Sequence, residues 1–324
     1  MKLSSVLSAL IASLLAGASP LAGAQGTWPS KPIRIVVPSA AGGASDFLAR
    51  SFGRYVTQET GQPVIIENRP GAASIIGAQV VKESAPDGYT FLSSGMSTQA
   101  ANPVLYTNLP YTPEKDFDEI GMYGVFPMIG LVRKDSPLRS VADIISYAKE
   151  NPDKLTFGHH AASSLVPVEL IKARAGVAIR AVPYKNVTDI SMNVASGVID
   201  LAFIDALSAA PALNSGLLTP IAVTTSKRFH SLPEVPTVAE TLPGYSMDGW
   251  LGLSAPAGTP KPVLDRMNAL LRDALADPTI KSNLESRGLV PTPMTLDEQK
   301  AWVIADRKRW VEWARIAKIQ PEAR

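Results

Sequence analysis

The pattern that most constrains the fold is a regular alternation of short apolar runs with longer stretches of helical periodicity. Residues 33–37 (IRIVV) form a continuous, mostly β-branched run, which is typical of a strand buried on both faces. The stretch after it has apolar residues on one helical face and reaches a helix stop at Gly61. Strands at 63–67 and 89–93 with a helix at 74–82 between them predict a parallel sheet covered by helices.

The same alternation continues through the rest of the chain. The apolar segment 120–132 predicts a strand that leaves a first lobe and enters a second, and segment 218–224 is the candidate for the return crossing. Between them, strands are predicted at 155–157, 179–183 and 201–204, and helices at 141–149, 166–175 and 189–196. Near the C-terminus we expect a helix at 263–275 and a last helix that begins with a capping box of Thr295 and Glu298.

The first 24 residues have the pattern of a secretory signal peptide. Lys2 precedes an apolar run over 3–15, and Ala22-Gly23-Ala24 offers small residues for cleavage that would leave Gln25 first. A membrane anchor is the alternative, but the run is shorter than the roughly 20 residues that a spanning helix needs. The chain has no cysteine, which excludes a lipid anchor on cysteine and any disulfide. No Arg pair precedes the run, so we expect export to the periplasm by the general secretory route.

Composition narrows the classes of partner. The chain of 324 residues is 46% hydrophobic, which is enough for two α/β lobes after removal of the leader. Its formal net charge is only +2, and no basic tract is present. Nucleic acid and anionic membrane surfaces are therefore not expected as partners.

The loop at 38–45, between the first strand and the first helix, is a candidate anion site. Gly42 and Gly43 remove side-chain bulk, and the helix that begins near Asp46 presents unpaired N–H groups and the positive end of its dipole. Such groups bind carboxylate or phosphate without Arg or Lys. The alternatives are an ordinary tight turn for the loop and a helix cap for Asp46.

A second loop of the same kind follows the strand at 155–157. It contains His159, His160, Ser163 and Ser164 ahead of a helix, so it offers imidazole and hydroxyl donors. Adjacent histidines point in different directions, so only one is expected to enter a cleft. Capping by Ser163 is the alternative, and a zinc site with His230 would need carboxylates to complete it.

Asp205 is a further candidate ligand residue. It follows the strand at 201–204, and open α/β sheets bind ligands at the carboxyl ends of their strands. A helix N-cap is the alternative role.

Nothing in the sequence predicts catalysis. No Gly-x-Ser-x-Gly elbow is present, and the His159-His160 pair has no assigned nucleophile or acid partner. We therefore expect no catalytic residue, no metal and no cofactor, and a secreted hydrolase is the least favoured alternative.

Several motifs, in order, resemble the Bug-type solute-binding proteins that serve tripartite tricarboxylate transporters. The opening motifs are Lys31-Pro32-Ile33-Arg34, Val36-Val37-Pro38 and Ala41-Gly42-Gly43 with Asp46, followed by Gly61-Gln62-Pro63-Val64, Glu67-Asn68-Arg69-Pro70-Gly71 and Ala85-Pro86-Asp87-Gly88-Tyr89-Thr90. The later ones are Val182-Pro183-Tyr184-Lys185, residues 232–240 (LPEVPTVAE), Pro243-Gly244-Tyr245 and Ala255-Pro256-Ala257-Gly258-Thr259-Pro260. The resemblance covers essentially the whole mature chain.

The resemblance implies an α/β, two-lobed periplasmic-binding-protein fold of type II, with a mainly parallel sheet flanked by helices in each lobe and two interlobe crossings. Lobe one would comprise 25–125 and 226–324, and lobe two 126–225. A carboxylate would be captured between the lobes, partly through ordered waters. Carried over by position and completed with the candidates above, the ligand residues are Ser39, Ala40, Ala41, Gly42, Gly43, Asp46, Ser94, Ser97, His159, His160, Ser163, Ser164 and Asp205.

Departures from the family pattern guide the expected cargo. Many members have small residues where this chain has His159 and His160, and many have Gly where it has Asn186. An imidazole donates to a second carboxylate or lies against an aromatic ring, so we expect a dicarboxylate, with an aromatic acid such as terephthalate as one form. We expect a monomer that delivers its ligand to the membrane subunits of a transporter. The alternative is presentation of the liganded protein to a periplasmic sensor kinase.

Overall fold

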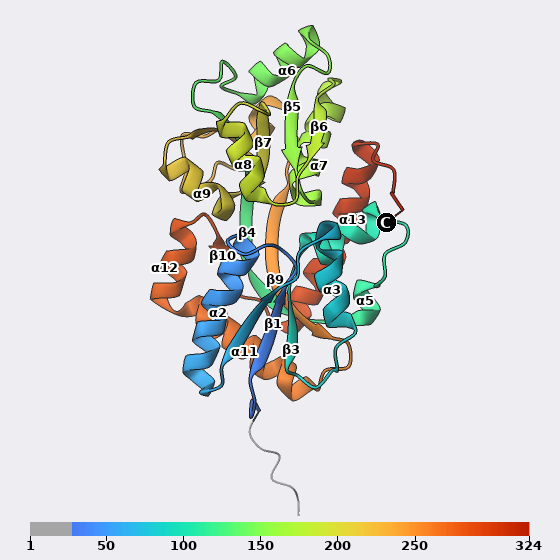
Figure 1. Cartoon of the computed structure of the whole chain (residues 1–324), viewed down its shortest axis with the longest axis vertical. Helices are drawn as coiled ribbons and strands as arrows, with labels where there is room; N and C mark the ends of the chain where they lie inside the picture. The colour runs from blue at the N-terminus through green and yellow to red at the C-terminus, as the bar shows by residue number, and fades with distance from the viewer. Residues whose placement is uncertain (1–27, 324) are drawn as a thin grey trace, which may run out of the picture. The chain divides into compact units, whose positions relative to one another are not determined.

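The structure, a computed structural model, describes residues 28–323 (Figure 1). The predicted signal peptide and Gln25 lie outside the described residues. From Lys31 on, the chain forms an α/β unit whose ten described strands make one mixed sheet with the path β2-β1-β3-β9-β4-β7-β5-β6. None of the helices between residues 28 and 323 is long and apolar enough to cross a bilayer.

The first part of the sheet is parallel, as the alternation predicts. Ile35 of the central strand lies opposite Ile66 on one side and Phe91 on the other. The strands and helices of this part are β1 (Ile33–Val37), α2 (Ala44–Thr60), β2 (Val64–Asn68), α3 (Ile75–Lys82) and β3 (Thr90–Gly95). Helix α2 ends at Gly61, whose φ of 71° is the left-handed conformation that terminates a helix and favours glycine. Helix α3 packs Ile75 and Val81 on the buried face of β1 and β3.

One long strand connects the two parts of the sheet. Residues 117–127 of β4 (Phe117–Arg133) run along β9 (Asp248–Pro256), with register shifts at Ile120 and Tyr123, and the last six residues of β4 pair with β7 and β8. Figure 1 shows β4 and β9 side by side between the two groups of strands. The crossing predicted at 120–132 is therefore made by β4, and the fold with two crossings is confirmed.

The return crossing differs from the strand predicted for it. Strand β8 (Leu218–Val223) pairs with Ile129–Arg133 of β4 and so stays with the second part of the sheet. The chain runs back along β9, whose Asp248 lies opposite Pro127. Tyr245, just before β9, donates its hydroxyl to the Pro167 carbonyl in the second part. The lobe boundaries at 125/126 and 225/226 stay predictions.

The second part repeats the parallel arrangement around its own core. Its parallel strands are β5 (Thr156–His159), β6 (Arg180–Pro183) and β7 (Leu201–Asp205), and its helices are α6 (Val141–Glu150), α7 (Ala162–Ala175), α8 (Val187–Ala195) and α9 (Ala206–Asn214). The fully buried Ile129 and Leu131 of β4 join Ile190 and Val194 of α8 in one apolar cluster. Ser140 caps α6 by accepting a hydrogen bond from the Asp143 N–H.

Most of the remaining elements pack on the first part of the sheet. They are α4 (Asn102–Leu105), α5 (Pro113–Asp116), α11 (Lys261–Ala276), α12 (Pro278–Ser286), β10 (Val290–Pro291) and α13 (Leu296–Ile316), whereas the short helix α10 (Val238–Thr241) lies against α6 of the second part. The capping box of Thr295 and Glu298 at the start of α13 is confirmed. After α13 the chain lies beside the segment that follows α4, where Glu322 N–H donates to the Leu105 carbonyl.

Candidate functional site

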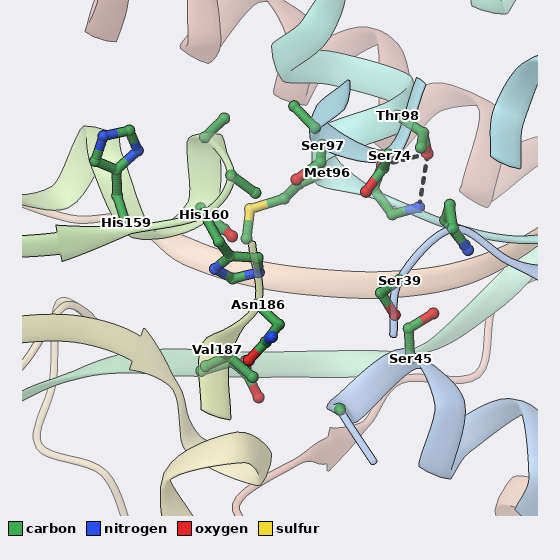
Figure 2. A pocket seen from close by; sticks show the side chains of 18 of the residues that line it. Ser39, Ser45, Ser74, Met96, Ser97, Thr98, His159, His160, Asn186 and Val187 are labelled. Atoms are coloured by element: carbon green, nitrogen blue, oxygen red, sulfur yellow. Dashed lines mark hydrogen bonds between the residues drawn. The ribbon is translucent and has the colours of Figure 1, made fainter. Parts of the chain in front are cut away.

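A cavity of about 770 Å³ lies between residues of the two parts of the sheet. The predicted site residues that line it are Ser39, Ala40, Ala41, Gly43, Ser94, Ser97, His159, His160, Ser163 and Asp205. Gly42, Asp46 and Ser164 are not among the lining residues. Figure 2 shows Ser39 and Ser45 on one side of the space and His160, Asn186 and Val187 on the other.

The start of α2 forms the first wall. Gly43 is the N-cap in an extended conformation, and no side chain caps this end of the helix. The first N–H groups of a helix have no partner within the helix, so those of α2 are available where Ala44 and Ser45 line the cavity. The Ser39 hydroxyl lies on the same wall, is buried, and has no hydrogen-bond partner among residues 28–323.

Asp46 does not line the cavity but supports the loop that forms this wall. Its carboxylate accepts hydrogen bonds from the Gly42 N–H at 3.0 Å, from Arg50 Nε at 3.0 Å and from Asn68 Nδ2 at 3.0 Å. Asn68 Nδ2 also donates to the Ser39 carbonyl at 3.1 Å. Burial alone would raise the pKa of Asp46, but these hydrogen bonds outweigh it and hold the pKa below its usual value. Asp46 therefore positions the loop, which is a third role beside the predicted cap and ligand contact.

A left-handed turn that the sequence reasoning missed lines the same wall. Ala72, Ala73 and Ser74 have φ of 45°, 52° and 75°, although none is glycine. Ser74 is also the uncapped N-cap of α3, so a second helix begins at the cavity. Asn102 holds the turn by donating its Nδ2 to the Ala73 carbonyl at 3.0 Å. The only sequence signal was Gly71 in the Glu67–Gly71 motif, to which no ligand role was assigned.

The start of α7 forms the opposite wall. The N-cap is Ala161, and the hydroxyl that fastens this turn is that of Ser164, which accepts from the His160 N–H at 3.0 Å. Ser163 faces the cavity, so the capping role considered for Ser163 is taken by its neighbour.

The two histidines have different surroundings. The His159 ring lies 6.1 Å from the Phe157 ring, while Nδ1 of His160 is 3.2 Å from the Ser164 hydroxyl. Figure 2 shows the His160 ring near Asn186 and the His159 ring turned away from it. Burial, with a smaller contribution from the charge of His159, lowers the pKa of His160 to about 4. Its imidazole is therefore neutral near pH 7 and offers hydrogen bonds without charge.

The remaining polar residues of this wall are two helix caps and one lysine. Asp205 caps α9 by accepting from the Ser208 N–H at 2.7 Å, as its alternative role predicts, and burial raises its pKa. Asn186 caps α8 in the same way through the Asp189 N–H. Lys185 is the one Lys or Arg among the described lining residues. An anion would thus be held mainly by helix N-termini, hydroxyls and an imidazole.

No group of three His, Asp or Glu side chains suited to a metal ion occurs within residues 28–323. His230, the third candidate for a zinc site, packs against Phe229 with ring centroids 4.5 Å apart and is not a lining residue.

Other lining residues were not predicted and are mostly apolar. They come from β4, β9, α7, the segment after β6, the segment from the end of β3 through α4, and the C-terminal segment. They are Met96, Leu105, Tyr106, Phe126, Met128, Leu165, Tyr184, Trp250, Leu251, Ile319 and Gln320, with Glu322 beside them. Most are far apart in sequence, so no local pattern identifies them.

Two α/β parts joined by paired crossing strands, with helix N-termini converging on one cavity, define the class of periplasmic solute-binding proteins. A family model for the tripartite tricarboxylate transporter family receptor matches residues 48–319, and the chain belongs to this family. Members of the family are periplasmic receptors that bind solutes and are not enzymes.

Individual relatives agree with this assignment. The chain is 35% identical over 308 residues to an Agrobacterium vitis protein of the UPF0065 group, covering 94% of this chain and 87% of the relative. It is 30% identical to Protein BugT of Bordetella pertussis, with 88% of each chain covered.

Solved structures share the fold. The R. palustris protein Rpa4515 with adipate superposes with a TM-score of 0.88 at 33% identity, covering 91% of this chain and 99% of the other. MatC from Rhodopseudomonas palustris with bound malate gives a TM-score of 0.83 at 30% identity, covering 88% and 99%.

Proposed function

We propose that this protein captures a small dicarboxylate in its cavity and delivers it to the membrane subunits of a tripartite tricarboxylate-type transporter. The observation that carries the proposal is the convergence of the N-termini of α2, α3 and α7 on one cavity from two opposite walls. Each N-terminus favours negative charge. Two walls with anion-binding groups fit a ligand with a carboxylate at each end.

The buried donors of the two walls support this assignment. The Ser39 hydroxyl on the α2 side has no partner, and a buried polar group without one costs free energy that a ligand oxygen would recover. On the α7 side, neutral His160 and Ser163 offer donors to the second carboxylate. The adipate and malate complexes of two relatives supply the chemical precedent.

The apolar lining favours a ligand with an apolar body. Phe126, Met128 and Trp250 come from the crossing strands, and Met96 and Tyr184 also line the cavity. Methylene groups or a benzene ring would gain contact there. Adipate and terephthalate therefore fit better than citrate, whose body carries a hydroxyl and a third carboxylate.

The rest of the proposal follows from the family. We infer that the chain is exported to the periplasm by its N-terminal leader, acts as a monomer, performs no catalysis and binds its transporter in the liganded state.

A thermal-shift screen tests the proposal. Adipate, terephthalate, malate and citrate are compared with benzoate and with adipamide, which keeps the length of adipate but lacks its charge. A ligand at 100 times its Kd stabilises the folded state by about 2.7 kcal/mol. We expect the largest shifts with adipate and terephthalate. Shifts with benzoate or adipamide alone would contradict a dicarboxylate site.

A further inference from the structure

A chain of hydrogen bonds leads from the cavity wall into the first part of the sheet. Ser94 on β3 lines the cavity, and its hydroxyl is 2.7 Å from that of Ser254 on the neighbouring strand β9. The Ser254 hydroxyl is also 2.8 Å from Oε2 of Glu119 on β4, the residue directly opposite it in the sheet. Three adjacent strands thus connect a residue of the cavity wall to a carboxyl group that has no part in ligand contact.

The number of hydrogens on this chain is limited. Ser254 accepts a hydrogen bond from Gln99 Nε2 at 3.2 Å and has one hydrogen of its own to donate. When Glu119 is ionised, Ser254 must donate to it, and the Ser94 hydrogen then points to Ser254. When Glu119 is protonated, it donates to Ser254, Ser254 donates to Ser94, and the Ser94 hydrogen is free to donate into the cavity.

The surroundings favour a chain with two states. Gln99, Ser254 and Gln299 are fully buried, so bulk water does not supply alternative partners to them. Oε1 of Gln99 and both amide atoms of Gln299 are buried without a close hydrogen bond, although Gln299 lies beside Glu119. None of these three amide atoms is hydrogen-bonded to the Ser254 hydroxyl. The protonation state of Glu119 therefore sets the direction in which that hydroxyl donates.

Glu119 titrates in the physiological range. Part of its side chain is exposed, which allows exchange of a proton with solvent, but desolvation of the carboxyl against buried Ser254 raises its pKa to about 7. The hydrogen bond from Ser254 and the neighbouring amide of Gln299 lower this pKa, and the nearby carboxylate of Asp118 raises it.

Asp118, the charged neighbour that raises the pKa of Glu119, has a partner of its own. Asp118 Oδ2 accepts from the Gly258 N–H at 2.8 Å. On α13, Arg307 donates to the Gln99 carbonyl at 2.8 Å and forms an ion pair with Glu114. Two side chains lie against Glu119: Ser254 from β9 and Gln299 from α13. Neither of them titrates.

We propose that Glu119 is a positioning residue for ligand binding, which sets through Ser254 whether Ser94 donates or accepts at the cavity wall. The inference rests on the proposed function, because it requires an anionic ligand. A carboxylate accepts hydrogen bonds only, so it favours the state in which Ser94 donates and Glu119 is protonated. Binding is then coupled to uptake of a proton from solvent, and affinity falls as the pH rises through the pKa of Glu119.

Calorimetric titration with adipate and terephthalate between about pH 6 and 8.5 tests the coupling. One hydrogen bond to a carboxylate contributes a factor of roughly ten in affinity, so we expect Kd to rise roughly tenfold across this range. In Glu119→Gln the amide donates to Ser254 at every pH, and Kd should stay near the low-pH value of the wild type. Asp118→Asn is the matched control: it should keep the pH dependence, with its midpoint at lower pH.

Titration in two buffers of different ionisation enthalpy is a second measurement, because it gives the number of protons taken up on binding. We expect uptake of a fraction of a proton per ligand near pH 7, which disappears in Glu119→Gln. Equal pH dependence in wild type and Glu119→Gln, or no proton uptake by the wild type, would overturn the inference and leave the proposed function intact. Failure of both acids to bind at any pH would overturn the proposed function and this inference together.

Discussion

At the scale of single residues, the two cavity walls are held by side chains that do not line the cavity. Asp46 accepts hydrogen bonds from the Gly42 N–H, Arg50 and Asn68 and so supports the first loop. Ser164 supports the second loop by accepting a hydrogen bond from the His160 N–H. Both are buried, at 4% and 1% exposure. A polar residue beside a binding loop thus has a supporting role that its sequence position does not distinguish from ligand contact.

Replacing Asp46 by Asn should loosen the first loop. Loss of the charged acceptor should lower the free energy of unfolding by about 1–3 kcal/mol and weaken ligand binding with it. Because the folded pKa of Asp46 lies below its usual value, its contribution is present above about pH 4 and is lost as the pH falls through the lowered pKa. Urea unfolding at several pH values measures this.

The control is Asp265→Asn, whose partner is the exposed Lys261 in an i,i+4 pair. Such a surface pair contributes about 0–1 kcal/mol. Equal losses in the two variants would contradict the supporting role of Asp46.

The protonation state of His160 is a second prediction at this scale. Its pKa of about 4 keeps the ring neutral from about pH 5 upward. Because the unfolded chain takes up a proton at its usual pKa near 6.5, stability falls as the pH drops from there toward the folded pKa. NMR titration measures it, with His160→Gln to assign the signal. A midpoint near 6.5 in the folded protein would contradict burial of a neutral ring.

At the scale of elements, the left-handed turn at Ala72–Ser74 is the least expected feature. Left-handed backbone costs a residue other than glycine roughly 1–2 kcal/mol, so the turn is held by its surroundings, including Asn102. Strain of this kind clusters at functional sites.

Replacing Ala73 by Gly should therefore stabilise the protein. Relief of strain at φ 52° should exceed the entropy that glycine adds to the unfolded chain, for a net gain of about 0.5–1 kcal/mol. Urea denaturation measures the change. The control is Ala301→Gly, at an exposed position of α13, which should lower the free energy of unfolding by about 1 kcal/mol. A loss of stability in both variants would show that the turn is unstrained.

Elements with a strong local signal were predictable, and those that depend on distant contacts were not. Helices α2 and α6 and strand β1 follow from periodicity and capping residues, whereas β9 was missed because Gly249 and Gly252 weaken its strand pattern. A Cβ at Gly252 would lie 2.6 Å from the Gly121 carbonyl of the paired strand, so close packing of the crossing strands requires the glycine. Alanines carry no signal for a left-handed turn, and the apolar lining residues come from segments that only the fold brings together.

At the scale of the whole molecule, the crossing strands join the two cavity walls. Phe126 and Met128 of β4 and Trp250 of β9 line the cavity at the point where the sheet passes from one part to the other. Any change in the relative position of the walls on ligand binding would therefore pass through β4 and β9. Glu119 and Ser254 lie on these same strands.

The most direct test of carboxylate capture is calorimetric titration of adipate and terephthalate into the wild type and Gly43→Leu. A Cβ at Gly43 would meet only the Ala40 carbonyl, at 3.8 Å, so leucine would fill the cavity beside the first turn of α2 with little cost to the fold. Ala301→Leu, on the exposed face of α13, is the control. We predict saturable binding of one ligand per chain in the wild type and the control, and its loss in Gly43→Leu with an unchanged unfolding midpoint. Undiminished binding in Gly43→Leu, or heat only with monocarboxylates or amides, would contradict the proposed site.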